Sequence, residues 1–395
     1  MREEEKEKVL LVGVETDETE DFERSMEELA DLAQACEMQV VGILTQKMSA
    51  INKSLYIGTG KVKEVREYAA ETGAQAVIFD NTLSPSQVRN LNEELELPIL
   101  DRTGLILDIF AKRAKTREAV LQVETARLKY LLPRQVGMRD ALSRQGGGSG
   151  SMSNKGAGEK KLELDRRKIE HRITELKKEL AKVEKQRQTQ RKRRGGSGIP
   201  QAALVGYTNA GKSTIMNRMV DLYKRDEQKR VLEKDMLFAT LETYVRKIEL
   251  PDRKSFFLAD TVGFIHKLPH DLVDAFRSTL EEVKNADLLI QVVDFSDEGF
   301  KHQMEVTEQT LRDLGAGDIP MITVYNKADL KGAETLPQTG TDKIYMAAGK
   351  GIGVRELAGM IREKLYLKEK ESSEKMLISN FDSVPIGIRY QKSPI

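Results

Sequence analysis

Apolar residues near the N-terminus come in short runs rich in Val and Ile, separated by amphipathic stretches. The runs cover residues 8–15, 39–46 and 75–80, and the amphipathic stretches cover 20–36 and 61–72. Strands that alternate with helices in this way are typical of an α/β domain with a parallel sheet. The pattern therefore predicts a small α/β domain over residues 1–111.

The pattern changes near residue 112, where the strand-like runs stop. A long helical stretch begins there and is expected to end near Pro133, and a glycine-rich loop follows it. The next segment, 159–194, places apolar side chains at spacings of four, three, four and three, namely at Ile169, Ile173, Leu176, Leu180 and Val183. This spacing is the seam of a coiled coil. It favours an antiparallel helical hairpin over the alternative of two unrelated surface helices.

The segment "AALVGYTNAGKSTIMNRM" (202–219) reads as an apolar strand, a glycine loop and a helix. It matches the spacing G-x-x-x-x-G-K-[ST], in which backbone N–H groups and a helix N-terminus surround a phosphate. Lys212 would bridge the β- and γ-phosphates, and the Ser213 hydroxyl would ligate Mg²⁺. The candidate nucleotide contacts in this P-loop are Gly206, Tyr207, Thr208, Asn209, Ala210, Gly211, Lys212, Ser213 and Thr214.

A second apolar strand ends in "DTVGF" at residues 260–264. Asp260 can hold the Mg²⁺ through a water molecule, and Gly263 can offer its N–H to the γ-phosphate. Phe264 stands where many such domains carry a glutamine that orients the attacking water. Because phenylalanine has no polar atom to offer, the free protein is expected to hydrolyse its nucleotide slowly.

A third apolar strand ends in "NKAD", with Asn326, Lys327 and Asp329. A carboxylate at Asp329 can accept two hydrogen bonds from N1–H and the exocyclic amine of guanine, whereas adenine lacks this pair of donors. The stem of Lys327 can cover the base. This motif follows the other two in the order that a GTP-binding domain requires. Together the three motifs predict a site for GTP and GDP.

One ligand of the Mg²⁺ should be a threonine from the loop between residues 220 and 245. The stretch "LFATLET" offers Thr240 and Thr243, and position alone does not choose between them. Loops of this kind order around the γ-phosphate and relax after hydrolysis.

Two local groups are candidates for compensating Phe264. Asn209 lies where K⁺-activated GTPase domains place an asparagine ligand, and a K⁺ ion there could stabilise charge as an arginine finger does. His266 is a conceivable base, but the "KLP" that follows it indicates a structural turn. Activation by an external partner is the other hypothesis.

Composition adds limits to this interpretation. The 395 residues carry 64 Lys+Arg against 63 Asp+Glu and a single cysteine, so no intramolecular disulfide framework is possible. No signal peptide and no run of 18 apolar residues is evident, which predicts a soluble cytoplasmic protein without a membrane span. Residues 159–194 are the exception to neutrality, with 15 Lys+Arg against 7 Asp+Glu. This excess is either a solvated helix face or a surface for the phosphates of folded RNA.

Taken together, the motifs resemble the HflX family of translational GTPases over about residues 8–367. The segments that carry the resemblance are "GYTNAGKST", "LFATL", "DTVGFIHKLPHDLVDAFRSTLEE", "YNKADL", "YIGTGKVKE", "DRTGLILDIFAKRAKTREAVLQVETARLKYLLPR" and "KLELDRRKIEHRI". The resemblance implies an α/β protein with four parts: an N-terminal domain (1–111), a coiled-coil hairpin (112–198), a P-loop GTPase domain with a mixed sheet (199–367) and a short tail (368–395). It selects Thr240 as the Mg²⁺ ligand, so the candidate catalytic residues are Lys212, Thr240 and Gly263.

The resemblance further implies a monomeric, ribosome-stimulated GTPase that binds the large ribosomal subunit and splits or rescues stalled or idle ribosomes. It also makes Phe264 a family trait, because related GTPase domains carry a hydrophobic residue there. The alternatives are a GTP-controlled tether with negligible turnover and a GTPase that acts on another structured RNA or a protein complex.

The chain departs from the family pattern at several places. The family continues "FATL" with D-P-T-T-R, whereas this chain has "ETYVR". The guanine-supporting loop S-A-K is "AAG" here, so only backbone contacts from Ala347 and Ala348 are expected. The glycine loop of the hairpin lacks G-T-R-G-P-G-E, and the tail is shorter than the C-terminal domain of many members.

Overall fold

The computed structural model describes most of the chain. The described residues are 6–17, 19, 21–145, 153–223, 237–238, 241, 243–267, 277–331 and 339–366. Thr240, the tip of the hairpin at 146–152 and the tail 368–395 lie outside them, so the predictions for these segments remain predictions.

A four-stranded parallel sheet forms the N-terminal domain, in the order β2-β1-β3-β4. Its elements are β1 (Lys8–Glu15), α1 (Phe22–Ala35), β2 (Gln39–Lys47), α2 (Thr59–Thr72), β3 (Ala76–Phe79), α3 (Pro85–Leu95), β4 (Ile99–Asp101) and α4 (Arg102–Arg113). Branched side chains of β1 and β3 are fully buried, because helices cover both faces. The predicted parallel α/β domain is confirmed.

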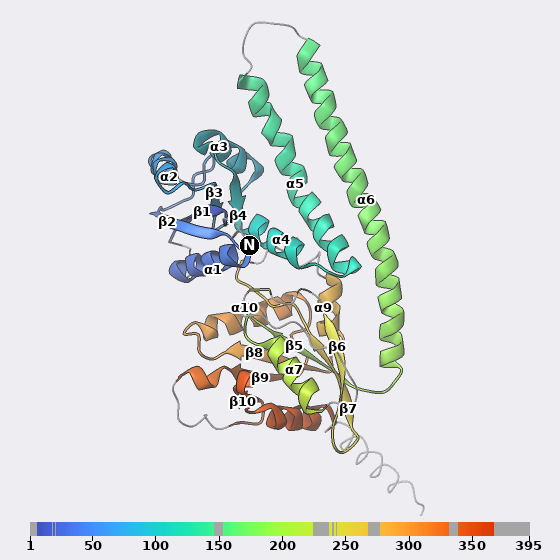
Figure 1. Ribbon diagram of the computed structural model, residues 1–395. Helices are drawn as coiled ribbons and strands as arrows, with labels where there is room; N and C mark the ends of the chain where they lie inside the picture. Colours follow the sequence, from blue (N-terminus) through green and yellow to red (C-terminus); the bar gives the residue numbers. More distant parts are fainter. Residues whose placement is uncertain are drawn as a thin grey trace, which may run out of the picture.

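Two long helices form an arm that projects from the body of the molecule (Figure 1). They are α5 (Arg117–Gln145) and α6 (Ser153–Gly195), and Ile173 and Leu176 of the predicted seam are buried between them. Ion pairs that join the helices include Arg187–Glu118 at 2.9 Å.

The expectation that the first helix ends near Pro133 is wrong, since α5 continues to Gln145. Proline removes one backbone hydrogen bond, but the tertiary contacts of its neighbours hold the helix together. Tyr130 Oη donates to Asp101 Oδ1 at 2.7 Å, and Arg134 Nη2 pairs with Asp101 Oδ2 at 2.9 Å. The predicted glycine loop is also too long, because α6 already begins at Ser153.

A six-stranded mixed sheet forms the second α/β unit, called here the G domain, in the order β10-β9-β8-β5-β7-β6. Among the strands that the structure describes in this sheet, only β6 is antiparallel to its neighbour. The elements are β5 (Gln201–Gly206), α7 (Lys212–Leu222), β6 (Tyr244–Glu249), β7 (Ser255–Asp260), α9 (Arg277–Lys284), β8 (Leu288–Asp294), α10 (Phe300–Asp313), β9 (Met321–Asn326), η1 (Ala328–Lys331), β10 (Lys343–Tyr345), η2 (Ala348–Lys350) and a helix over 354–366. The predicted mixed sheet flanked by helices is confirmed.

A group of buried and half-buried polar and charged side chains, called here the interdomain cluster, joins the N-terminal domain to the G domain. It comprises Ser25, Glu28, Asp80, Arg102 and Lys267. Asp80 accepts from Arg102 Nη1 at 2.7 Å and from Lys267 Nζ at 2.5 Å, and both Asp80 and Arg102 are almost completely buried. Since buried charges are stable only when paired, the cluster fixes the position of Lys267 against the N-terminal domain.

Replacing Asp80 with alanine would leave Arg102 and Lys267 without this carboxylate in a buried setting. We expect Asp80→Ala to lower the free energy of unfolding by about 3–5 kcal/mol, as for other broken buried pairs. The matched control is Glu15→Ala, which breaks the exposed Lys47–Glu15 pair and should cost less than about 1 kcal/mol. Urea unfolding of the full-length chain measures both, and equal losses would contradict the assignment.

Candidate nucleotide-binding site

The P-loop connects the end of β5 to the start of α7, and its backbone requires glycine at both ends. Gly206 has φ 137°, and a Cβ there would lie 2.2 Å from the carbonyl oxygen of Val292 on β8. Gly211 has φ 96° and caps α7, and a Cβ there would lie 2.3 Å from the Asn326 amide nitrogen. Such positive φ values favour glycine. The two glycines thus let the loop curl around the N-terminus of α7, as a phosphate cradle requires.

Lys212 lies inside this loop, with 6% of its surface exposed. Its ammonium donates to the carbonyl oxygens of Gly206 at 3.1 Å and Tyr207 at 2.7 Å. Burial lowers the pKa of Lys212 to about 8, and the nearby Asp260 opposes that effect. The ammonium therefore faces the concave side of the loop, where the β- and γ-phosphates of a nucleotide would lie.

Asp260 and Ser213 provide oxygen ligands of the kind Mg²⁺ prefers. Ser213 Oγ donates to Asp260 Oδ2 at 2.7 Å, and Asp260 is fully buried at the end of β7. Burial raises the pKa of Asp260 to about 6, against the Ser213 hydrogen bond and the Lys212 charge. Asp260 Oδ1 has no hydrogen-bond partner among the described residues. This orphaned oxygen beside a hydroxyl fits a hydrated Mg²⁺, which would neutralise phosphate charge.

Asn326, at the end of β9, joins the P-loop to the loop that is expected to support guanine. Its Nδ2 donates to the Ala210 carbonyl at 2.9 Å, and its Oδ1 accepts from the Ala348 N–H at 3.0 Å. The Ala348 N–H, predicted to contact the base, is therefore engaged by Asn326 in this structure. Ala347 immediately precedes η2, so both predicted backbone positions lie at this loop.

The two charged residues of "NKAD" each have an ion-pair partner. Lys327 Nζ lies 2.7 Å from Asp294 Oδ2, and Asp329 Oδ2 lies 2.9 Å from Lys350 Nζ. Sequence reasoning missed Lys350, because it treated the lysine of the guanine-supporting loop as lost. The signal that could have found it is a lysine one residue after the expected position.

Phe264 is turned away from the site. Its ring is 2% exposed and packs in the core with Val205, Leu280 and Val283, while its backbone pairs with Gly206 and Thr208. The side chain therefore cannot orient a water molecule. The preceding Gly263 approaches the P-loop so closely that a Cβ would lie 2.6 Å from Thr208 Cα, which places its backbone beside the phosphate site.

His266 and Tyr207 link this segment to the N-terminal domain. The His266 N–H donates to Tyr207 Oη at 2.7 Å, and Tyr207 Oη also hydrogen-bonds Glu28 of the interdomain cluster. Burial lowers the pKa of His266 to about 4, and the nearby Lys267 and Arg102 charges act in the same direction. The imidazole is thus neutral above pH 5.

Two threonines considered in the sequence analysis also fall in the G domain. Thr214 lies in the first turn of α7, and Thr243 immediately precedes β6.

An acidic crevice of about 620 Å³ lies beside the P-loop, between α1 and the loop after β8. Tyr207, Thr208 and Asn209 form its P-loop wall, and Arg24 crosses it to pair with Asp297 at 2.6 Å. The carboxylates that line it belong to Asp21, Glu23, Glu27, Glu28, Asp31, Asp294, Asp297 and Glu298. The crevice therefore attracts cations to the outer side of the P-loop.

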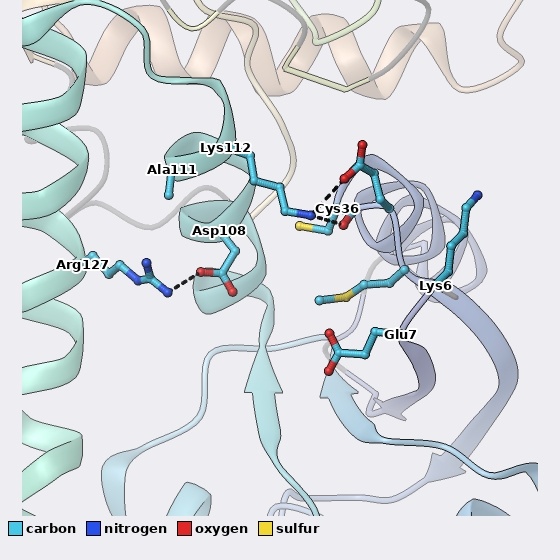
Figure 2. A pocket seen from close by; sticks show the side chains of 9 residues that line it. Lys6, Glu7, Cys36, Asp108, Ala111, Lys112 and Arg127 are labelled. Carbon is cyan, nitrogen blue, oxygen red and sulfur yellow. Dashed lines mark hydrogen bonds and ion pairs between the residues drawn. The ribbon is translucent and has the colours of Figure 1, made fainter. Parts of the chain in front are cut away.

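A second cavity, of about 830 Å³, lies in the N-terminal domain near the base of the arm (Figure 2). Lys112 Nζ donates to the Cys36 carbonyl at 2.6 Å, and Arg127 pairs with Asp108 at 3.1 Å. These cations are already engaged, so the cavity offers little to an anionic ligand. Throughout the described parts of the chain, no group of three His, Cys, Asp or Glu could hold a metal ion, and no helix is long and apolar enough to span a membrane.

Comparisons with family models agree with this geometry. Three family models match consecutive parts of the chain: "GTP-binding GTPase N-terminal" (23–111), "GTP-binding GTPase Middle Region" (113–194) and "50S ribosome-binding GTPase" (201–327). A crystal structure of a GTP-binding protein from Sulfolobus solfataricus in complex with GDP has a TM-score of 0.45 and 24% identity, covering 90% of this chain and 98% of that one. The fold and the matched domains define a P-loop GTPase.

Two relatives identify the family within that class. The chain is 47% identical over 368 residues to GTPase HflX of Caldanaerobacter subterraneus subsp. tengcongensis, covering 93% of this chain and 82% of that protein. It is 39% identical over 365 residues to GTPase HflX of Escherichia coli K12, covering 91% and 83%. The chain belongs to the GTPase HflX family.

The low pKa of His266 argues against a role as general base. We expect His266→Ala to change turnover less than twofold, because the alanine keeps the backbone N–H that binds Tyr207 Oη. The pH dependence of turnover near the ordinary histidine pKa of about 6.5 should be the same in His266→Ala as in the unaltered protein. A large loss, or an inflection that His266→Ala removes, would contradict this.

The low pKa of His266 should also make the fold less stable as the pH falls from about 6.5 toward 4. In that range the imidazole binds a proton in the unfolded chain and not in the folded protein.

Proposed function

We propose that this GTPase acts on the large ribosomal subunit and splits or rescues stalled or idle ribosomes. The observation that carries the proposal is a row of lysines on the arm that have no ion-pair partner among the described residues. The arm leads directly into the G domain, which holds the candidate GTP site. Two comparisons support it: the match to a model described as a 50S ribosome-binding GTPase, and membership of the HflX family. A ribosomal partner would place the protein in the cytoplasm.

The cations of the arm fall into two groups. Arg166, Arg167, Arg172, Arg187 and Arg194 each pair with a carboxylate of the arm or the G domain. In contrast, Lys178, Lys182 and Lys185 are exposed and have no ion pair within the described part of the chain. Their spacings of four and three put them on one side of α6. A row of free ammonium groups is suited to the phosphates of folded RNA.

We assign the nucleotide chemistry to the residues described above. Lys212 would bind the β- and γ-phosphates, Ser213 and Thr240 would ligate Mg²⁺, and Asp260 would hold it through a water molecule. Gly263 would donate its N–H to the γ-phosphate, and Asp329 would accept the two guanine donors. Because Phe264 is buried, the attacking water must be oriented by the loop that carries Thr240, once it orders around the γ-phosphate, or by groups of the partner.

The acidic crevice supports a K⁺ ion as a further activator. Asn209 lines the crevice, and its side chain is exposed there, on a left-handed backbone with φ 60°. Carboxylates there raise the local concentration of cations, so K⁺ can reach the phosphates from the crevice.

The K⁺ proposal predicts faster turnover in potassium than in sodium at equal ionic strength. Asn209→Gly is the informative variant, because it removes the side chain with its amide while glycine tolerates the positive φ. We expect it to abolish the potassium advantage, a loss of about tenfold or ~1.4 kcal/mol of transition-state stabilisation, while GDP affinity stays near wild type. Equal rates of the unaltered protein in the two salts would end this part of the proposal.

The arm proposal predicts that Lys178→Ala/Lys182→Ala/Lys185→Ala weakens binding to purified large subunits. Losing three phosphate contacts should also reduce the slope of log affinity against log salt concentration by about three. Sedimentation with subunits over a series of KCl concentrations measures both. The matched control is Arg172→Ala, whose cation already pairs within the arm.

Unchanged affinity and salt slope in the triple variant would show that the row is only a solvated face. One of the two alternatives is a GTP-dependent ribosome or RNA tether with negligible turnover. In that case binding to subunits would depend on GTP without any stimulated release of phosphate.

A further inference from the structure

Lys350 stands at the guanine side of the site although the family's loop lysine is replaced by glycine. Its ammonium lies 2.9 Å from Asp329 Oδ2, and the two side chains are 63% and 20% exposed. The expected lysine position is Gly349, one residue earlier in the chain. A lysine therefore reaches the guanine-reading carboxylate from a shifted position.

The turn that carries Lys350 is held rigidly against the P-loop helix. Arg218 of α7 donates from Nε to the Ala348 carbonyl at 3.0 Å and from Nη2 to the Gly349 carbonyl. The Ala348 N–H donates to Asn326, and the Lys350 N–H donates to the Ala347 carbonyl at 3.0 Å. The 3₁₀ turn η2 thus presents Lys350 from a fixed backbone.

The ammonium and a guanine base can share the Asp329 carboxylate. An ionised carboxylate offers about four acceptor sites on its two oxygens. Guanine N1–H and its exocyclic amine take one site on each oxygen, which leaves a further site on Oδ2 for Lys350. An ion pair that is already formed fixes the rotation of the carboxylate before the base arrives, so less ordering is required on binding.

We infer that Lys350 is a specificity-determining residue that orients Asp329 for guanine, from a position one residue after that of the family's loop lysine. The inference rests on the proposed role of Asp329. A fixed carboxylate cannot rotate away from the acceptor N1 of adenine, so orientation strengthens the rejection of adenine as well as the binding of guanine. It also favours two guanine hydrogen bonds over the single one that hypoxanthine can make.

The test is calorimetric binding of GDP and IDP to the full-length protein, since IDP lacks the exocyclic amine. We expect Lys350→Ala to weaken GDP binding about two- to fivefold, the range of exposed ion pairs, and to affect IDP less. The GDP preference, expressed as the ratio of the two dissociation constants, should fall. Lys343→Ala on β10 removes another exposed lysine nearby and should leave the ratio unchanged.

A rescue variant makes the test specific. A Cβ at Gly349 would meet no atom within 4 Å, so lysine can be introduced there without a clash. We expect Gly349→Lys in the Lys350→Ala background to restore the GDP preference, which a general packing defect would not allow.

Two outcomes distinguish a failure of this inference from a failure of the proposed guanine site. If Lys350→Ala keeps the wild-type ratio while Asp329→Asn loses GDP binding, Lys350 has no such role and the guanine site stands. If Asp329→Asn also leaves GDP binding unchanged, the guanine site itself is misassigned.

Discussion

The pairing of Asp80 with both Arg102 and Lys267 is the contact on which the arrangement of the two domains depends. A carboxylate without exposed surface needs compensating charge, and one of its two cations comes from the segment that follows Gly263. Lys267 also has a left-handed backbone, with φ 56°, a conformation that surrounding contacts must maintain. Any shift of this segment toward a γ-phosphate must therefore carry the N-terminal domain with it or break these bonds.

Tyr207 brings the P-loop into the same network. Its hydroxyl contacts both Glu28 and the His266 N–H, so the phosphate loop, the segment after Gly263 and the N-terminal domain share one hydrogen-bonded path. Phe264 lies between these anchor points with its ring in the core. The buried ring stabilises the segment, and the consequence is that no glutamine-like group is available there for catalysis.

Local patterns in the sequence predict the parts of the molecule that local chemistry determines. The P-loop, the strands that precede Asp260 and Asn326, and the seam around Leu176 all depend on spacing within a few residues. The helix α3 and strand β4 were not predicted, although Ser84 and Gln87 form a capping box that marks the start of α3. Strand β4 is only three residues long and gives little periodicity.

The remaining features depend on contacts between distant residues. Pro133 predicts a helix end, but Asp101 holds its neighbours in α5. Lys267 and Asp80 are 187 positions apart, and no spacing rule connects them. The pairing of Lys350 with Asp329 requires the geometry of a 3₁₀ turn that a motif comparison by position does not represent.

The most direct test of the account is GTP hydrolysis by the purified protein in potassium buffer, alone and with purified large ribosomal subunits. Lys212→Ala serves as the control for contaminating activity. We expect slow turnover by the protein alone and a many-fold rise with subunits, because the partner would supply what the buried Phe264 cannot. Turnover that stays flat while the protein still binds subunits would contradict it.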